Sequence, residues 1–258
     1  MLLTGASGGI GSAIAHALHA RGAHLRLTAR RGDVLDALAE ELGGRVEVLS
    51  ADLADASEVA ALPSRAGAVD VLVANAALPA TGRLESFDPA QIDRALDVNL
   101  RAPIQLARAL VPAMVERGAG HLVFISSLSG KVASPGSALY AATKFGLRGF
   151  ALGVRQDLHG TGVGVTVVVP GFIRGAGLFA DTGLKLPPGV GTRSPEEVAE
   201  AVVDGIERDR AEVEVAPLGL RAGALVGAVA PTLSAVVQRG LGGRELASEF
   251  ARAQGAKR

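Results

Sequence analysis

Short apolar runs alternate with amphipathic segments along most of this chain. Apolar runs typical of buried β-strands occupy residues 1–4, 23–28, 45–49, 69–74, 121–126, 164–169 and 211–216. Segments with the periodicity of helices lie at 12–21, 33–42, 88–117, 137–159 and 194–209, and another begins near residue 55. This alternation predicts a doubly wound parallel α/β sheet of about seven strands, with right-handed crossovers and helices on both faces.

Capping residues mark several of these boundaries. Asp55 and Ser194 have side chains that can cap a helix, and Asp88 followed by Pro89 places a cap and a proline at another helix start. Only three residues precede Thr4, fewer than a central strand normally has. The first strand is therefore expected to be short, unless the start of the chain has been trimmed.

A glycine-rich turn, Gly5 to Gly11, joins the first predicted strand to the first predicted helix. In this context glycines let the backbone approach a pyrophosphate that is held at the helix N-terminus. An ordinary tight turn would have the same glycines, but the flanking strand and helix favour nucleotide binding.

Three polar residues follow one another around the fifth predicted strand and the next helix. Ser127 lies at the end of that strand, and Tyr140 and Lys144 are one helical turn apart, so their side chains share a face. A nearby ammonium stabilises a phenolate, so this pairing predicts a lowered pKa for Tyr140. In isolation, such a pair is more often a packed tyrosine beside a solvated lysine.

Composition removes several classes of function. The 258 residues suit a single α/β domain, and with aromatics at only 3% its core must be built from Ala, Val and Leu. Lys plus Arg and Asp plus Glu both number 26, which removes the electrostatic argument for nucleic acid or an anionic membrane as the main partner. The chain has no cysteine and its five histidines form no ligand cluster, so we expect no metal and a reducing, cytoplasmic location.

The motifs taken together are similar to those of a known family. The pattern Thr4-Gly5-x-x-x-Gly9-x-Gly11, with Asn99, Ser127, Tyr140, Lys144 and Pro170-Gly171 in this order, resembles the classical short-chain dehydrogenase/reductase family. The resemblance runs from Thr4 to about Ala216. It implies a Rossmann-type fold and an NAD(P)-dependent oxidoreductase that interconverts a ketone or aldehyde and an alcohol.

The resemblance also implies roles for the matching residues. Tyr140 would be the general acid that protonates the carbonyl oxygen while hydride arrives from the nicotinamide. Lys144 would hold the nicotinamide ribose and lower the pKa of Tyr140, Ser127 would orient the substrate oxygen, and Asn99 would anchor a water that feeds protons to Lys144. The implied cofactor-binding positions are Gly5, Ser7, Gly9, Ile10, Gly11, Arg30, Arg31, Asp52, Leu53, Asn75, Ala76, Tyr140, Lys144, Pro170, Gly171 and Ile173.

Charge at the end of the second strand favours NADP(H) over NAD(H). A carboxylate for the ribose hydroxyls usually stands there in enzymes that prefer NAD(H), but this chain has Ala29. Arg30 and Arg31 follow, and a guanidinium can bind a ribose 2′-phosphate. Two surface arginines in a loop are the alternative. Asp52 would accept a hydrogen bond from the adenine amine.

Two positions depart from the family pattern. Ala77 stands where relatives usually have a glycine, which constrains the backbone there. Gly175 stands where many relatives have a threonine near the cofactor, so its hydroxyl is missing. Both departures bear on cofactor binding, whereas the catalytic set is intact.

The family resemblance ends near Ala216 and divides the chain into two parts. We expect a catalytic and dinucleotide-binding domain at 1–216, with a substrate loop at 172–193, and a C-terminal helical extension at 217–258 packed on the same domain. A mainly apolar small-molecule carbonyl or alcohol is the expected substrate, and its predicted pocket residues are Leu78, Leu128, Phe172, Leu178 and Phe179.

The segment 222–238 is uncharged for seventeen residues, fewer than the roughly 20 that span a bilayer, and glycines and a proline interrupt it. It is expected to pack over the substrate cleft or at a subunit interface. The alternative is a surface that dips into a membrane.

Three functions compete on these grounds. The first is an NADP(H)-dependent oxidoreductase, expected to form a homodimer or homotetramer through the helices that carry Asn99 and Tyr140. The second is a cofactor-binding sensor or scaffold with little turnover, suggested by Ala77 and Gly175. The third is a sugar epimerase or dehydratase of the extended branch, against which the glycine spacing and the lack of a large C-terminal substrate domain argue.

Overall fold

Seven parallel strands form a single sheet in the order β3-β2-β1-β4-β5-β6-β7. The computed structural model describes residues 1–184, 186, 190–240 and 243–254. The strands are β1 (Leu2–Thr4), β2 (Leu25–Thr28), β3 (Val46–Val48), β4 (Val71–Ala74), β5 (Gly120–Ile125), β6 (Val163–Pro170) and β7 (Glu212–Val215). The predicted doubly wound Rossmann-type sheet is confirmed, and its first strand is short, with three residues.

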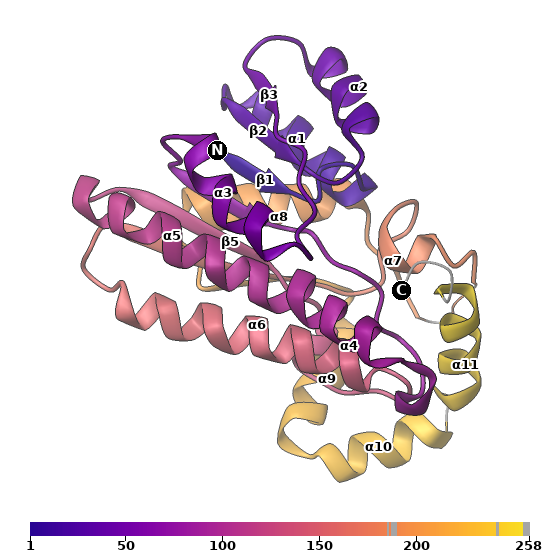
Figure 1. Ribbon diagram of the computed structural model, residues 1–258. Helices are drawn as coiled ribbons and strands as arrows, with labels where there is room; N and C mark the ends of the chain where they lie inside the picture. The colour runs from indigo at the N-terminus through magenta and orange to yellow at the C-terminus, as the bar shows by residue number, and fades with distance from the viewer. Residues whose placement is uncertain (185, 187–189, 241–242, 255–258) are drawn as a thin grey trace.

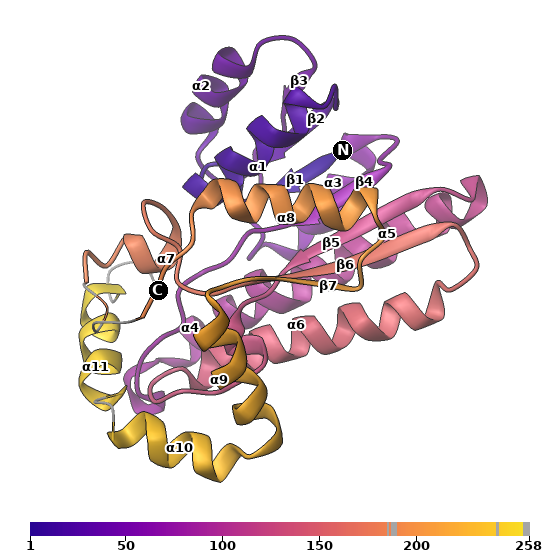
Figure 2. The same cartoon turned by 180° about the vertical axis from the view of Figure 1, so that it is seen from behind.

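Helices cover both faces of the sheet because strand side chains alternate between two cores. Leu3, Val73 and Val123 face α1 (Gly9–Ala20), α2 (Gly32–Leu42) and α8 (Pro195–Glu207). Leu2, Leu72 and Leu122 face α3 (Ala56–Ala66), α5 (Ala102–Arg117) and α6 (Ala138–Asp157). The second layer is in front in Figure 1, and α8 is in front in Figure 2.

The predicted helix at 88–117 is divided into three parts. Asp88 caps α4 (Pro89–Leu96) through a capping box with Gln91, and α5 begins only at Ala102. Between them, residues Asp97–Arg101 form a turn of π-helix. The predicted helix is confirmed, because the chain is helical from Pro89 to Arg117, but apolar periodicity did not reveal the π turn inserted at its centre. Such turns are frequent at functional sites, and this one contains Asn99.

Beyond β6, the chain builds a group of helices at the carboxyl side of the sheet. These are α7 (Gly177–Ala180), α9 (Leu218–Val229), α10 (Pro231–Gly240) and α11 (Gly243–Gln254). In both ribbon views α11 lies beside α7, while α9 and α10 extend from the end of β7 (Figures 1 and 2). Positions 185 and 187–189 of the predicted substrate loop, and 241–242 and 255–258 of the predicted extension, lie outside the described residues.

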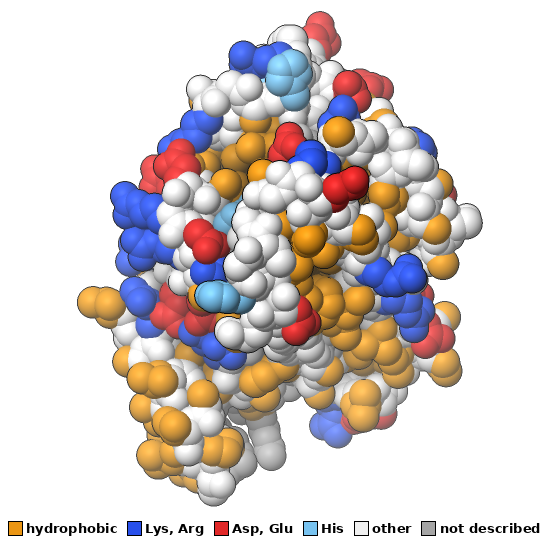
Figure 3. All heavy atoms as spheres, turned by 90° about the vertical axis from the view of Figure 1, so that its left-hand side faces the viewer, with side chains coloured by type: hydrophobic (Ala, Val, Ile, Leu, Met, Phe, Trp, Pro, Cys, Tyr) orange, Lys and Arg blue, Asp and Glu red, His pale blue; other side chains and the backbone are white. Residues whose placement is uncertain are grey.

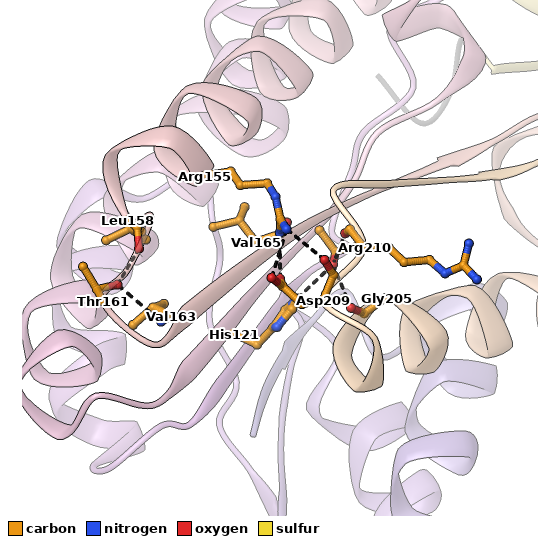
Figure 4. A network of polar contacts seen from close by, with 10 residues as sticks. His121, Arg155, Leu158, Thr161, Val163, Val165, Gly205, Asp209 and Arg210 are labelled. Atoms are coloured by element: carbon orange, nitrogen blue, oxygen red, sulfur yellow. Dashed lines mark hydrogen bonds and ion pairs between the residues drawn. The ribbon is translucent and has the colours of Figure 1, made fainter.

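The two ends of the sheet have different roles. At the amino ends of β5 and β6, the buried His121 shares a hydrogen bond with Thr166 (2.8 Å), and Arg155 forms an ion pair with Asp209 at 2.7 Å (Figure 4). This network lies at the opposite end of the strands from the crevice at the topological switch point between β1 and β4. At the carboxyl ends, the switch point leaves the crevice in which open α/β sheets bind ligands.

Among the described residues, no helix is both long and apolar enough to cross a membrane.

Candidate active site

A cavity of about 1670 Å³ opens at the carboxyl ends of the strands. It is lined by the turns after β1, β2, β4, β5 and β6, by α6 and by the C-terminal helices. Of all the site residues predicted from the sequence, Asn99 alone does not line it. The fold thus brings the predicted cofactor, substrate and catalytic residues to one place.

Ser127, Tyr140 and Lys144 meet on one wall of the cavity. Ser127 lies two residues past the end of β5 and accepts a hydrogen bond from the backbone of Ser129, which fixes the short turn after the strand. The Ser127 hydroxyl is hydrogen-bonded to the Tyr140 phenol. Lys144 is 2% exposed, its Nζ lies 5.7 Å from the centre of the Tyr140 ring, and it donates to the carbonyl of Ile125 at 2.9 Å.

Burial controls the ionisation of this pair. It raises the pKa of Tyr140 to about 12, and the hydrogen bond from Ser127 offsets only part of that shift. The expectation that Tyr140 has a lowered pKa was therefore wrong for the cofactor-free chain, because desolvation of the phenolate outweighs the neighbouring lysine. Desolvation also lowers the pKa of Lys144 to about 8.

Asn99 holds the backbone near the cavity instead of lining it. Its Oδ1 accepts from the Leu78 amide at 2.7 Å, and its Nδ2 donates to the Leu78 carbonyl at 3.0 Å. The side chain is fully buried. It thereby fixes the segment after β4, whose Leu78 lines the cavity. The sequence predicted a role for Asn99 but not these two hydrogen bonds with the backbone of Leu78.

The glycine-rich turn has the close backbone packing that a phosphate cradle requires. Gly5 has φ +68°, and a Cβ there would lie 2.7 Å from Cα of Ala76. A Cβ on Gly11 would lie 2.2 Å from the carbonyl oxygen of Gly5. Gly8 at the N-terminus of α1 provides no side-chain cap, and the first turn of α1 holds no acidic residue. Backbone N–H groups at this positive helix end can therefore bind an anion, and these residues fit a dinucleotide pyrophosphate.

The side of the cavity near the ends of β2 and β3 carries several cationic side chains. Arg30 and Arg31 are exposed at its rim, and Arg31 donates to the backbone carbonyl of Ser7 at 2.8 Å. Asp52 forms an ion pair with Arg94 at 3.2 Å. Arg94 lines the cavity but was not predicted, because it comes from α4 and only the tertiary structure brings it to Asp52.

The two departures from the family pattern have different consequences for the backbone. Gly175 has φ +77°, a conformation that a β-branched residue avoids, so glycine suits this loop better than threonine would. Ala77 is not among the non-glycine residues with positive φ, which are Arg45 and Asp209 in the part of the chain described. The alanine is therefore accommodated without that strain.

The side of the cavity near α7 and the C-terminal helices is apolar and includes residues that the sequence did not single out. Phe172 and Phe179 form an edge-to-face pair with ring centroids 5.2 Å apart. Phe250 of α11 completes a three-ring cluster, 6.3 Å from Phe172 and 5.7 Å from Phe179. Further lining residues from the C-terminal helices are Leu220, Ala224, Val226, Val237, Gln238 and Gln254. No motif marks these residues, and the sequence suggested only that an uncharged helix could cover the cleft.

Comparisons with known proteins agree with this geometry. Residues 1–183 match the family model described as short chain dehydrogenase. The chain is 36% identical to the ketoacyl reductase HetN of Nostoc sp. over 222 residues, which cover 83% of this chain and 77% of that protein. It is 41% identical to nodulation protein G of Rhizobium sp. over 179 residues, covering 68% of this chain and 73% of the relative.

Solved structures show the same similarity in three dimensions. A short-chain dehydrogenase from Sphingobium yanoikuyae in complex with NADPH superposes with a TM-score of 0.78 at 31% sequence identity. The match covers 90% of this chain and 94% of that structure.

Proposed function

Because the chain belongs to the short-chain dehydrogenase family and is an NAD(P)-dependent carbonyl or alcohol oxidoreductase, we propose that it reduces a mainly apolar ketone or aldehyde with NADPH. The observation that carries this proposal is the hydrogen-bonded pair of Ser127 and Tyr140, beside the buried Lys144, in the cavity that also contains the glycine-rich turn. An acid, its orienting hydroxyl and a phosphate cradle are the groups that this reduction needs from the protein.

Each of the three side chains has a task that follows from its position. The bound nicotinamide supplies the hydride. Tyr140 stays protonated at neutral pH because burial raises its pKa to about 12, so its phenol can donate a proton to the carbonyl oxygen. Ser127 hydrogen-bonds the same oxygen and orients it. Lys144, held by the carbonyl of Ile125, presents its ammonium beside the phenol and balances the charge left when the proton departs.

Replacing the phenol tests this assignment. Tyr140→Phe should lower NADPH-dependent carbonyl reduction by roughly 10²- to 10⁴-fold, the usual range for loss of an acid–base group. NADPH binding, measured by calorimetry, should stay within a few-fold of the wild type. Full activity in Tyr140→Phe would remove Tyr140 from the mechanism. Binding of NADPH by a wild type that turns over no carbonyl in a broad panel would favour a sensor or scaffold instead.

The preference for NADPH rests on the two rim arginines. Arg31 is tied to Ser7 in the glycine-rich turn, and Arg30 lines the same rim, so their guanidinium groups flank the place where a ribose 2′-phosphate would lie. No carboxylate occupies the end of β2, where Ala29 stands.

Arg30→Ala should weaken NADPH binding by roughly tenfold or more, since one charge-assisted hydrogen bond contributes about 1.5–3 kcal/mol. NADH binding should change little. Arg65→Ala removes another exposed arginine outside the cavity and is the matched control. Equal losses of NADPH and NADH affinity in Arg30→Ala would show that Arg30 does not contact the 2′-phosphate.

The proposed assembly is a homodimer or homotetramer through α5 and α6. Val115 of α5 and Phe145 of α6 are 37% and 42% exposed, and a second copy of the chain could cover both. Sedimentation velocity of the wild type and of Phe145→Glu would test this. A wild type that sediments as a monomer would contradict it.

A further inference from the structure

The C-terminal helix α11 forms a wall of the same cavity that contains Tyr140. Ala247 packs against the turn before α6, where a Cβ added to Gly136 would lie 3.0 Å from the Ala247 side chain. One turn further along α11, Phe250 joins the rings of Phe172 and Phe179. Helix α11 therefore spans from the turn before the Tyr140 helix to the loop that follows β6, as its place beside α7 in Figure 2 indicates.

Gln254 ends this wall with a buried polar atom that has no partner. The residue is only 4% exposed and lines the cavity. Its Nε2 donates to the carbonyl of Leu178 at 2.9 Å, which fixes the orientation of the amide. Its Oε1 is buried and has no hydrogen-bond partner in the described structure. A buried acceptor left unpaired is costly, so an atom like this is expected to be satisfied when the site is occupied.

The surroundings of Gln254 define what can satisfy it. A carbonyl oxygen can only accept, so the partner must carry an O–H or N–H group. Apolar rings lie one turn away on α11, at Phe250, and beside that ring at Phe179. The other amide on this side, Gln238, already donates to Ser234 and to the backbone of Ala133. A ligand that fits has an apolar body and one hydrogen-bond donor.

We propose that Gln254 determines substrate specificity by accepting a hydrogen bond from a hydroxyl or amide N–H on the part of the substrate remote from the reacting carbonyl. The substrate class is thus narrowed from apolar carbonyl compounds to those that carry such a donor at the far end of an apolar chain. This inference rests on the proposed reduction at Tyr140.

Three matched ketone series test the donor requirement. Straight-chain 2-alkanones of increasing length are compared with the same ketones that carry a terminal hydroxyl or a terminal methoxy group. The wild type should reduce the hydroxy ketone about tenfold better than the methoxy ketone in kcat/KM, at the chain length that reaches Gln254. Gln254→Met should bring this ratio close to one while it still reduces the plain ketone. Gln254→Glu retains acceptor oxygens but cannot donate to the carbonyl of Leu178, so it should lose the fixed orientation of the side chain and most of the preference.

Several outcomes would overturn the proposal. A wild type without a hydroxyl preference at any chain length would do so. So would a Gln254→Met variant that loses kcat/KM equally for all three series, since that is the effect of a purely structural role. Glu249→Gln, an exposed change on the same helix, should leave every ratio unchanged. Gln254→Leu provides a second variant without the acceptor if Gln254→Met does not fold.

A binding measurement separates this inference from the proposed function. Calorimetry of the hydroxy and methoxy ketones is performed with two proteins, Tyr140→Phe and the double variant that also carries Gln254→Met. Both are saturated with NADPH. A preference that depends on Gln254 would support the specificity role even if the wild type reduces none of the ketones, which would overturn the reduction alone. Equal binding of both ketones would overturn the role of Gln254 even if the reduction proceeds.

Discussion

Tyr140 and Lys144 experience the same burial with opposite consequences for their charges. Burial disfavours the phenolate and raises the pKa of Tyr140 to about 12, and it disfavours the ammonium and lowers the pKa of Lys144 to about 8. The two groups are therefore both in their protonated forms at neutral pH, but only the lysine titrates close to it. In the reduction that we propose, Tyr140 would give the proton to the carbonyl, whereas the pH limit of the reaction is expected to come from Lys144.

The pH dependence of the reduction follows from this difference. With a pKa of about 8, Lys144 loses its charge as pH rises, while Tyr140 stays protonated until about pH 12. We expect kcat/KM for NADPH, which reports ionisations of the cofactor-free protein, to be level below about pH 8 and to fall roughly tenfold per pH unit above it. Lys144→Met should lower the rate and abolish this fall of kcat/KM above about pH 8. If the fall of kcat/KM at high pH persists in Lys144→Met, the titration of another group must cause it.

At the scale of elements, the turn after β5 is tied to the start of α9 by ion pairs. Lys131, just past Ser127 and its turn, contacts both Glu212 and Glu214 of β7. Glu214 also binds Arg221 in the first turns of α9, at 2.5 Å. Burial alone would raise the pKa of Glu214, but hydrogen bonds from Lys131 and Arg221 outweigh it and lower the pKa. The carboxylate thus couples the catalytic turn to a helix that lines the substrate side of the cavity.

Glu214→Gln tests whether this tie positions α9. The amide keeps the shape but loses the charge, so the contacts with Lys131 and Arg221 weaken. KM for the carbonyl substrate should rise roughly fivefold or more, which corresponds to about 1 kcal/mol. NADPH affinity should change less, because the glycine-rich turn lies apart from β7. Glu47→Gln, in an exposed ion pair at the other edge of the sheet, is the control. An equal rise in the NADPH dissociation constant would contradict a role specific to α9.

For the whole molecule, the amino ends of the strands provide stability while the carboxyl ends hold the site. His121 is buried in the network of Figure 4, and desolvation, only partly offset by Asp209, lowers its pKa to about 4. The unfolded chain binds this proton near pH 6.5. Stability from the neutral His121 is therefore complete above pH 6.5 and is lost as pH falls towards 4.

Acid should therefore destabilise the wild type more than a variant without this histidine. Between pH 7 and pH 5, the free energy of unfolding in urea should fall about 2 kcal/mol further for the wild type than for His121→Gln. The difference between the two proteins should be constant from pH 7 to pH 8. Parallel losses in both proteins on acidification would show that His121 is not the group responsible.

The outer surface of the C-terminal helices is apolar. Hydrophobic side chains gather over α9 and α10 at the lower left of Figure 3, where Leu225, Val229 and Leu233 are 67%, 79% and 56% exposed. The inner side of the same helices lines the cavity through Leu220 and Val237. The lack of charge in the segment 222–238 is thus explained on its inner side, because that side lines the apolar part of the cavity.

Periodicity and short motifs in the sequence determined the sheet, its flanking helices and the set of residues that we propose as catalytic. Period-two strands such as β5 and the turn from Gly5 to Gly11 depend on local patterns, so they can be predicted without knowing what they contact. The same holds for Tyr140 and Lys144, because one helical turn places them on one face.

Tertiary structure alone decided the rest, because it depends on surroundings that no local pattern records. The raised pKa of Tyr140 comes from burial in the folded cavity, and the ion pair of Arg94 with Asp52 joins residues from different elements. Gln254 lies far from every motif, and only the packing of α11 makes it a lining residue of the cavity. The sequence thus determined which polar groups the site contains, and the fold decided how these groups ionise and which side chains line the cavity around them.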